Sequence, residues 1–92
     1  MTAWRAEERC AWPDIDPDAM YPSPADASGI REAREVCAAC PIRVRAACLA
    51  EAMRDEGGQR AESRWGVRGG LTEDERSLLY RRTRRAETRA AA

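Results

Sequence analysis

Four cysteines constrain this chain more than any other feature of its sequence. They are Cys10, Cys37, Cys40 and Cys48, and the last three fall within one twelve-residue stretch around a C-x-x-C pair. The chain has no histidine, so a metal site could draw only on these thiolates and on carboxylates. Because clustered cysteines bind metal, form disulfides or react with oxidants, the first question is which of these chemistries holds the fold together.

The chain is poor in the apolar side chains that normally hold a domain together. Its 92 residues include only ten Leu, Ile and Val and no Phe. That share is about 11%, below the roughly 20% at which chains tend to stay disordered. The formal net charge is zero, so self-repulsion does not explain the weak core. A chain of this length also buries little surface on folding, and the cysteines are therefore expected to cross-link the fold.

Charge is distributed unevenly along the chain. Residues 1–35 carry eight acids and four arginines, whereas residues 73–92 carry four acids and six arginines. A basic tail of this kind indicates contact with nucleic acid or with an acidic partner, and a solvated helix face explains it equally well.

The sequence shows no signal for export or membrane insertion. Its first ten residues lack the apolar segment of a secretory signal, and no run approaches the length of a membrane span. We therefore expect a cytoplasmic protein. In that compartment lasting disulfides are uncommon, and clustered cysteines more often bind metal or act in redox chemistry.

Helical periodicity and cap residues predict most of the regular structure. The predicted segments are a helix over 2–11, a loop over 13–28 with one turn at 17–20, a helix from 28 or 29 to 40, a helix over 41–56, and a last helix over 72–85 with a frayed end. Pro41 is expected in the first turn of its helix, and Gly57 and Gly58 are expected to end it.

A glycine-rich turn precedes the last helix. Three glycines fall between Gly66 and Gly70, which implies a tight turn with positive φ or a close backbone approach. Thr72 and Glu75 then form a capping box. We expect an all-α fold, a small bundle of four to five short helices, divided into residues 1–72 and a basic helix and tail over residues 73–92.

Three kinds of site agree in part with the cysteine spacing. A zinc site with four cysteine ligands usually uses two C-x-x-C pairs, and this chain has one. A thioredoxin-like redox pair requires a βαβ context, and the only extended piece we predict is short, at residues 65–68. A [4Fe–4S] cluster takes four thiolates, often three close together and one remote. The spacing favours the cluster and leaves zinc, redox-active thiols and disulfides open.

Several short motifs occur in an order that resembles one protein family. They are Trp4 ahead of Cys10, Asp16-Pro17-Asp18 leading to Tyr21-Pro22, Val36-Cys37-Ala38-Ala39-Cys40-Pro41, Ala47-Cys48-Leu49, and Gly66-Val67-Arg68-Gly69-Gly70-Leu71-Thr72-Glu73 followed by arginines. Each motif alone is weak, but their order and separation are specific and extend over the chain from Trp4 to about Arg85. The chain resembles the WhiB-like actinobacterial iron–sulfur transcription regulators.

The resemblance implies a cytoplasmic helical protein organised around one [4Fe–4S] cluster, sensitive to oxygen and nitric oxide, with Cys10, Cys37, Cys40 and Cys48 as ligands. It also implies binding to the C-terminal domain of the primary sigma factor and contact with promoter DNA. We assign partner contact to the glycine turn, namely Trp65, Gly66, Val67, Arg68, Gly69 and Gly70. We assign DNA contact to the basic tail, namely Arg81, Arg82, Arg84 and Arg85.

The chain departs from the family pattern at two places. Seven residues separate Cys40 from Cys48, where the family usually has five. A continuous helix would then rise about 12 Å between these cysteines instead of about 9 Å, so we expect non-helical backbone around residues 40–43, or a bulge. Arg68 stands where the family usually has a tryptophan that contacts the sigma factor. Trp65 is expected to supply that ring instead.

Two other functions remain open at this point. The Cys37 and Cys40 pair would suit a small protein disulfide reductase, an activity that some members of the family are reported to show without the cluster. A zinc-stabilised interaction module is the other. The sequence shows no catalytic triad, no paired acids for acid–base chemistry and no phosphate-binding loop, so we expect a regulator and not an enzyme.

Overall fold

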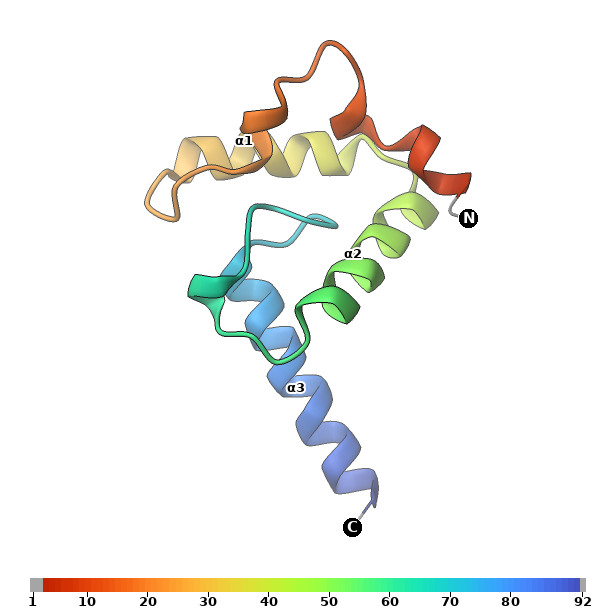
Figure 1. Ribbon diagram of the computed structural model, residues 1–92, viewed down its shortest axis with the longest axis vertical. Helices are drawn as coiled ribbons and strands as arrows, with labels where there is room; N and C mark the ends of the chain where they lie inside the picture. Colours follow the sequence, from red (N-terminus) through yellow and green to blue (C-terminus); the bar gives the residue numbers. More distant parts are fainter. Residues whose placement is uncertain (1–2, 92) are drawn as a thin grey trace.

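Short helices make up nearly all of the regular structure in this computed structural model, which describes residues 3–91 (Figure 1). Three are α-helices and four are 3₁₀ helices. In chain order they are η1 (Ala3–Glu7), η2 (Arg9–Ala11), η3 (Pro17–Met20), α1 (Ala27–Ala38), α2 (Ile42–Glu56), η4 (Ala61–Ser63) and α3 (Glu73–Ala91). Within the described residues, the only β-pairing is a single bridge between Arg68 and Leu71. The predicted all-α class is confirmed.

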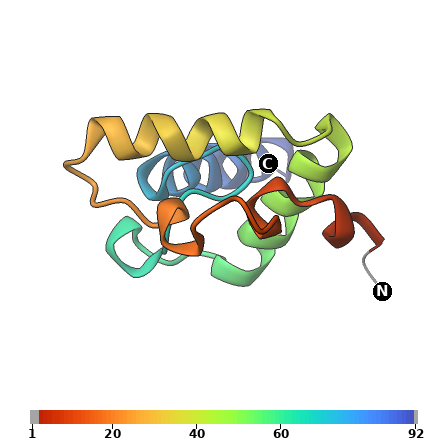
Figure 2. The same cartoon turned by 90° about the horizontal axis from the view of Figure 1, so that it is seen from above.

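The three α-helices run in different directions. In Figure 1, α1 lies across the top, α2 descends from its end, and the second half of α3 projects away from both. Seen from above in Figure 2, the N-terminal 3₁₀ segments run alongside α1. The Cα atoms extend over 49 × 33 × 18 Å, and the projecting part of α3 accounts for the long dimension. No helix within residues 3–91 combines the length and apolar character needed to span a membrane.

Local hydrogen bonds explain where the helices begin and end. The side chain of Asp26 accepts the Gly29 N–H at 2.9 Å and caps α1 one or two residues earlier than predicted. Gly57, at φ 52°, ends α2 as predicted. At the start of α3, the Thr72 N–H donates to Glu75 Oε1 at 2.9 Å, and the Glu75 N–H donates to Thr72 Oγ1 at 3.3 Å. The predicted capping box is therefore confirmed.

Two helix predictions were wrong. The segment predicted as one N-terminal helix forms η1 and η2, because Glu8 between them is extended, at φ −63° and ψ 115°. Its predicted cap, Thr2, lies outside the described residues. The last helix continues to Ala91 instead of ending near Arg85, since alanine is the strongest helix former. The count of α-helices in the described chain is thus three, not four to five.

The apolar core is small and includes cysteine. Met20, Ala33, Cys37 and Val67 form one buried cluster. Cys10 and Val36 pack against it while remaining partly exposed. Because η2, η3, α1 and the glycine-rich turn all contribute to this cluster, the core and the cysteines occupy the same part of the molecule.

A buried ion-pair network joins the end of α2 to the beginning of α3. Glu56 Oε1 accepts from Arg64 Nη1 and from Arg76 Nε, each at 2.8 Å, and Glu56 Oε2 accepts from Arg76 Nη2 at 3.0 Å. Both guanidinium groups are fully buried. Arg76 also donates to the carbonyls of Gly66 and Leu71, at 2.7 and 2.8 Å. Arg76 therefore fastens both ends of the glycine-rich turn to α3.

Candidate metal centre

Cysteines that are far apart in the sequence line one small cavity. Cys10 comes from η2, Cys37 from the last turn of α1, Cys40 from the bend after α1, and Cys48 from α2. The cavity measures about 20 Å³, enough for roughly one water molecule. Cys37 is buried and the other three cysteines are half-buried. The structure thus brings together all four predicted ligands.

The longer separation between Cys40 and Cys48 is absorbed by a break in the helix. Cys40 lies in a bend, and Pro41 is extended at φ −54° and ψ 147° before α2 begins at Ile42. A proline disfavours helical backbone in the residue before it, which explains the break at Cys40. The expected non-helical backbone is therefore confirmed at Cys40 and Pro41, but the prediction was wrong for Ile42 and Arg43, which are already helical.

Backbone N–H groups point at three of the four sulfur atoms. The Arg9 N–H donates to Cys40 Sγ at 3.2 Å. In the glycine-rich turn, the Gly69 N–H bonds to the sulfur of Cys48, and the Gly70 N–H bonds to that of Cys37. Such donors stabilise negative charge on sulfur and orient the side chain.

Burial raises the pKa of three of the cysteine thiols, Cys10, Cys37 and Cys48, and so favours their protonated form. It raises the pKa of Cys10 to about 11, and the neighbouring Glu8 carboxylate and the other cysteines add to that rise. Burial also raises the pKa of Cys37 and of Cys48, against the opposing effect of their backbone N–H donors. Four thiolates crowded into one cavity would repel one another, so their deprotonated form requires a positively charged partner such as a metal.

Two charged residues beside the cavity were not predicted. Glu8 lines it, with its Oε2 atom 3.8 Å from Cys10 Sγ. Arg45 also lines it, and its charge lowers the pKa of Cys37. Neither position carries a motif. The signals available in the sequence were their positions: Glu8 lies two residues before Cys10, and Arg45 lies about one helical turn before Cys48.

The glycine-rich turn is pressed against α2. Gly69 and Gly70 occupy its tip at φ 60° and 86°, while Arg68 and Leu71 pair on either side with N···O distances of 3.0 and 3.1 Å. A Cβ atom on Gly69 would lie 2.5 Å from the Cβ of Leu49, a distance that no side chain tolerates. Glycine at this position is what allows the backbone to reach the sulfur of the adjoining Cys48.

The residues predicted to contact a partner face different ways. Trp65 is 73% exposed, whereas Gly66, Val67 and Gly69 are buried. Arg68 lies over α2, within ion-pair distance of three of its acids. Those pairs, at 3.6, 3.6 and 3.8 Å, are with Glu51, Asp55 and Glu56. Of the predicted contact residues, Trp65 therefore presents the most exposed side chain to a partner.

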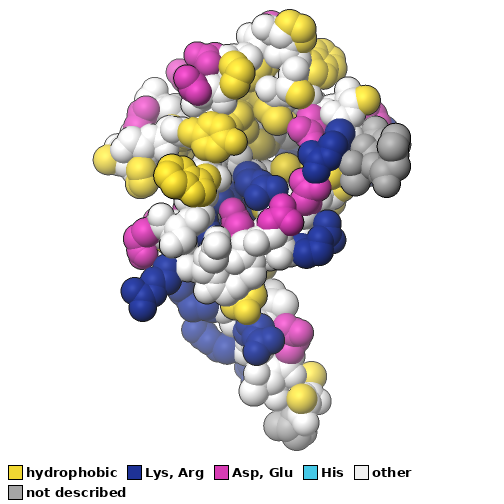
Figure 3. All heavy atoms as spheres, in the orientation of Figure 1, with side chains coloured by type: hydrophobic (Ala, Val, Ile, Leu, Met, Phe, Trp, Pro, Cys, Tyr) yellow, Lys and Arg dark blue, Asp and Glu magenta, His cyan; other side chains and the backbone are white. Residues whose placement is uncertain are grey.

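The predicted DNA contacts lie well away from the cysteines. Arg81, Arg82, Arg84 and Arg85 are all exposed on the projecting part of α3. Figure 3 shows hydrophobic side chains gathered over the upper part of the molecule and basic ones along α3 below it. The cysteine site and the basic surface are therefore separate regions, connected through the base of α3.

The donor set suits a metal group, although the thiols do not already surround one ion. Within residues 3–91, no group of three or more Cys, Asp or Glu side chains is arranged to hold a single metal ion, and all four cysteines are free. Four sulfur ligands without histidine favour zinc or iron–sulfur centres. The shared cavity and the N–H donors around it suit thiolate ligands, but a volume of about 20 Å³ holds a single ion, and a cluster requires the cavity to open.

Comparison with known proteins places the chain among transcription factors. The family model described as Transcription factor WhiB matches residues 4–79. Transcriptional regulator WhiB1 of Bifidobacterium longum is 40% identical over 86 residues, which cover 90% of this chain and 83% of that protein. WhiB1 of Mycobacterium tuberculosis is 38% identical over 90 residues, or 94% of each chain. WhiB of Streptomyces coelicolor is 35% identical over 76 residues, which cover 83% of this chain and 74% of that protein. The chain belongs to the WhiB family.

Proposed function

We propose that this protein regulates transcription and holds one [4Fe–4S] cluster through Cys10, Cys37, Cys40 and Cys48. The observation that carries the proposal is that these four cysteines, supplied by four separate segments, line one cavity. Membership of the WhiB family and the names of its relatives, which are transcriptional regulators, support the regulatory part.

The cysteine spacing agrees with a cluster better than with zinc. A zinc site with four cysteine ligands usually uses two C-x-x-C pairs, and this chain has one. A [4Fe–4S] cluster often takes three thiolates close in the sequence and one remote, which is the pattern of Cys37, Cys40 and Cys48 with Cys10. When bound, the cluster would supply reactivity toward oxygen and nitric oxide.

The surrounding backbone would stabilise the ligands and connect them to α3. The N–H groups of Arg9, Gly69 and Gly70 each meet a cysteine sulfur, where they offset negative charge. Because Arg76 of α3 binds the carbonyls on either side of that glycine turn, a change at the cysteines reaches the basic helix through a few short contacts. Since the apolar core is small, metal binding contributes to folding itself.

Two surfaces would carry out the regulation. The basic face of α3, with Arg81, Arg82, Arg84 and Arg85, would contact promoter DNA through phosphates. The exposed ring of Trp65, beside the glycine turn, would contact the C-terminal domain of the primary sigma factor. Arg68 is unsuited to replace an apolar contact there because α2 acids already surround its charge.

The disulfide reductase alternative is disfavoured by the position of Cys37. A nucleophilic cysteine needs a lowered pKa, which a helix N-terminus provides. Cys37 instead lies in the last turn of α1, where the helix dipole opposes a thiolate, and burial raises its pKa.

Purification without air, followed by iron and acid-labile sulfide analysis, tests the proposal. We expect a brown protein with about four irons and four sulfides per chain, and Cys→Ser changes at each ligand should remove the colour. Colourless protein with stoichiometric zinc would contradict the cluster. Colourless protein that reduces insulin disulfides would favour the reductase.

A further inference from the structure

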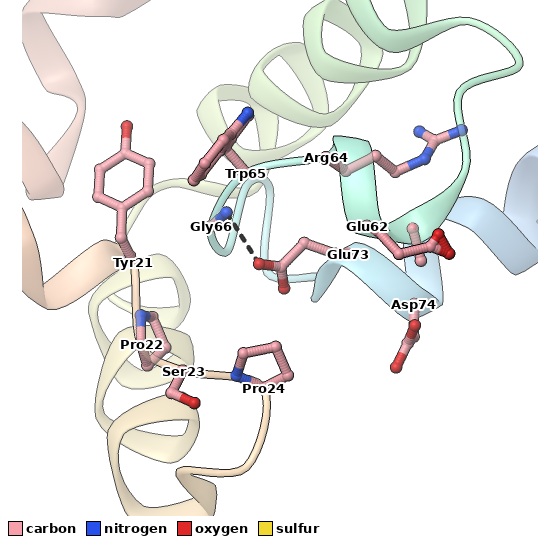
Figure 4. Close-up of a pocket in the computed structure, with 11 residues that line it drawn as sticks. Tyr21, Pro22, Ser23, Pro24, Glu62, Arg64, Trp65, Gly66, Glu73 and Asp74 are labelled. Atoms are coloured by element: carbon pink, nitrogen blue, oxygen red, sulfur yellow. Dashed lines mark hydrogen bonds between the residues drawn. The ribbon is translucent and has the colours of Figure 1, made fainter.

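A second and larger hollow lies on the other side of the glycine turn from the cysteines. It measures about 500 Å³ and is formed where the loop after η3 meets η4 and the start of α3 (Figure 4). We call it the Tyr21–Trp65 groove. Its aromatic and charged lining residues are Tyr21, Glu62, Arg64, Trp65, Glu73 and Asp74.

Two aromatic rings stand exposed at this groove. Tyr21 is 61% exposed and Trp65 is 73% exposed, and Figure 4 shows both on the same side of the hollow. The ring of Tyr21 rests on Gly66, since a Cβ atom there would lie 2.7 Å from Tyr21 Cδ1. In a chain with so little apolar volume, two large rings left in solvent indicate a surface that a partner covers.

The charge around the groove is negative. Glu62, Glu73 and Asp74 contribute carboxylates, and Glu73 accepts the Gly66 N–H at 3.1 Å. Arg64 is the one cation in the lining, but its buried guanidinium is committed to Glu56 and to two backbone carbonyls. A ligand in the groove therefore meets more acidic than basic side chains among the residues that line it.

We propose that the Tyr21–Trp65 groove binds a segment of a protein partner that inserts an arginine or lysine side chain. The stem of that side chain would lie against the exposed ring of Trp65, and its head would point toward the end of the groove lined by Glu62, Glu73 and Asp74 (Figure 4). Aromatic faces attract cations, and ionised acceptors bind them with short hydrogen bonds. Tyrosine and tryptophan are also the side chains that most often dominate protein interfaces.

The same features exclude nucleic acid as the occupant. Three carboxylates repel phosphates, whereas the arginines of α3 offer a separate surface for them. This groove extends the partner contact proposed for Trp65 and specifies the chemistry of that partner. The inference rests on the proposed function only because both take the partner at Trp65 to be a protein. It does not require the cluster.

A peptide titration of the 92-residue chain tests whether the groove prefers a cationic side chain. The probe is a seven-residue fluorescein-labelled peptide with one central arginine between two leucines and Gly-Ser ends. The control peptide has citrulline, which is uncharged and of similar size, in place of the arginine. We expect the arginine peptide to bind at least about tenfold more tightly than the citrulline peptide.

Matched variants of the groove complete the test. Trp65→Ala should weaken binding of the arginine peptide at least about tenfold, whereas Trp12→Ala, which removes an exposed ring outside the groove, should not. The double change of Glu62→Gln and Asp74→Asn should weaken it as well. Glu87→Gln, an exposed acid further along α3, serves as its control.

Three results would overturn the inference. They are no binding of the arginine peptide, equal binding of both peptides, and concentration-dependent dimerisation abolished by Trp65→Ala, which would make a second copy the occupant. Iron analysis and promoter binding, measured on the same variants, keep the regulator proposal separate. Absence of iron in protein that still binds the arginine peptide would contradict the cluster alone.

Discussion

Arg76 and Glu56 form a bidentate ion pair in the interior of the protein, with Nε–Oε1 and Nη2–Oε2 distances of 2.8 and 3.0 Å. The Arg76 side chain is fully buried and Glu56 is nearly so. The remaining donors of Arg76 bind the carbonyls of Trp65, Gly66 and Leu71. One guanidinium therefore joins α2, α3 and the turn that reaches the cysteine sulfurs.

Removing the charge of Glu56 should destabilise the protein strongly. In Glu56→Gln, the guanidinium groups of Arg64 and Arg76 stay buried without their counter-charge, and breaking a buried pair in this way costs about 3–5 kcal/mol. Denaturant unfolding, followed by circular dichroism, measures the loss. Asp55→Asn is the matched control, because Asp55 is exposed and pairs only at 3.6 Å with Arg68. Equal effects of the two changes would contradict a special role for the buried network.

The tip of the glycine turn gives a second prediction. Gly69→Ala would place a Cβ atom 2.5 Å from that of Leu49, so the turn must move and its N–H must leave the sulfur of Cys48. We expect lower iron content after anaerobic purification and faster bleaching of the visible absorbance in air.

Gly57→Ala separates steric displacement from backbone strain in that experiment. Gly57 also has positive φ, at 52°, but a Cβ atom there meets nothing within 4 Å. This variant should lose about 1–3 kcal/mol of stability through backbone strain, because φ 52° and ψ −131° form a conformation that favours glycine, while retaining iron. If both variants bleach at the same rate, contact between the turn and Cys48 is not what protects the centre.

The raised pKa of Cys10 predicts how the metal-free protein responds to alkali. Burial and then Glu8 raise this pKa from 9.0 to about 11, so the folded state holds the proton longer than the unfolded state does. The corresponding stability is present below about pH 9 and is lost as the pH rises toward 11. Alkylation of Cys10 by iodoacetamide, followed by peptide mass spectrometry, should show a midpoint near pH 11.

Neighbouring acids provide a check on that interpretation. Glu8→Gln should lower the pKa of Cys10 and speed alkylation at pH 9. Glu7→Gln should leave the rate unchanged, because the carboxylate of Glu7 pairs with Arg43 instead. A midpoint near that of a free thiol in the unmodified protein would show that Cys10 is more exposed than in this structure.

Local signals in the sequence were sufficient for much of the fold and for grouping the four cysteines, which line one cavity. The capping box at Thr72, the helix end at Gly57 and the break near Pro41 depend on a few adjacent residues, and each was predictable. The cysteines could be grouped because each chemistry that their spacing allows brings at least two of them together, and the spacing favours one that uses all four. Whether Thr2 caps a helix and whether the cysteines bind iron stay predictions.

The remaining features depend on contacts between distant segments. Glu56 and Arg76 lie twenty positions apart on separate helices, and their sequence contexts are those of ordinary solvated charges. Tyr21 and Trp65 are further apart still, and no periodicity connects them. Residues 3–11 form two 3₁₀ helices instead of one α-helix because a single residue between them, Glu8, is extended. A segment this short has no hydrophobic periodicity from which such a break could be predicted.

The four arginines on the projecting part of α3 give the last prediction. Each phosphate contact contributes about −0.9 to the slope of log binding constant against log salt concentration. Replacing Arg81, Arg82, Arg84 and Arg85 with alanine should therefore make the slope for promoter binding shallower by about 3 to 4. Fluorescence anisotropy with a labelled promoter fragment at several salt concentrations measures it.

Control variants test whether the loss of charge, and not a loss of helix, makes the slope shallower. The same four positions changed to lysine keep the charge and should restore most of the slope, whereas the alanine variant should retain its helix by circular dichroism. The double change of Arg31→Ala and Arg54→Ala removes exposed arginines from α1 and α2 and should leave the slope unaltered. An unaltered slope in the α3 variant would instead mean that this face of the helix does not touch DNA.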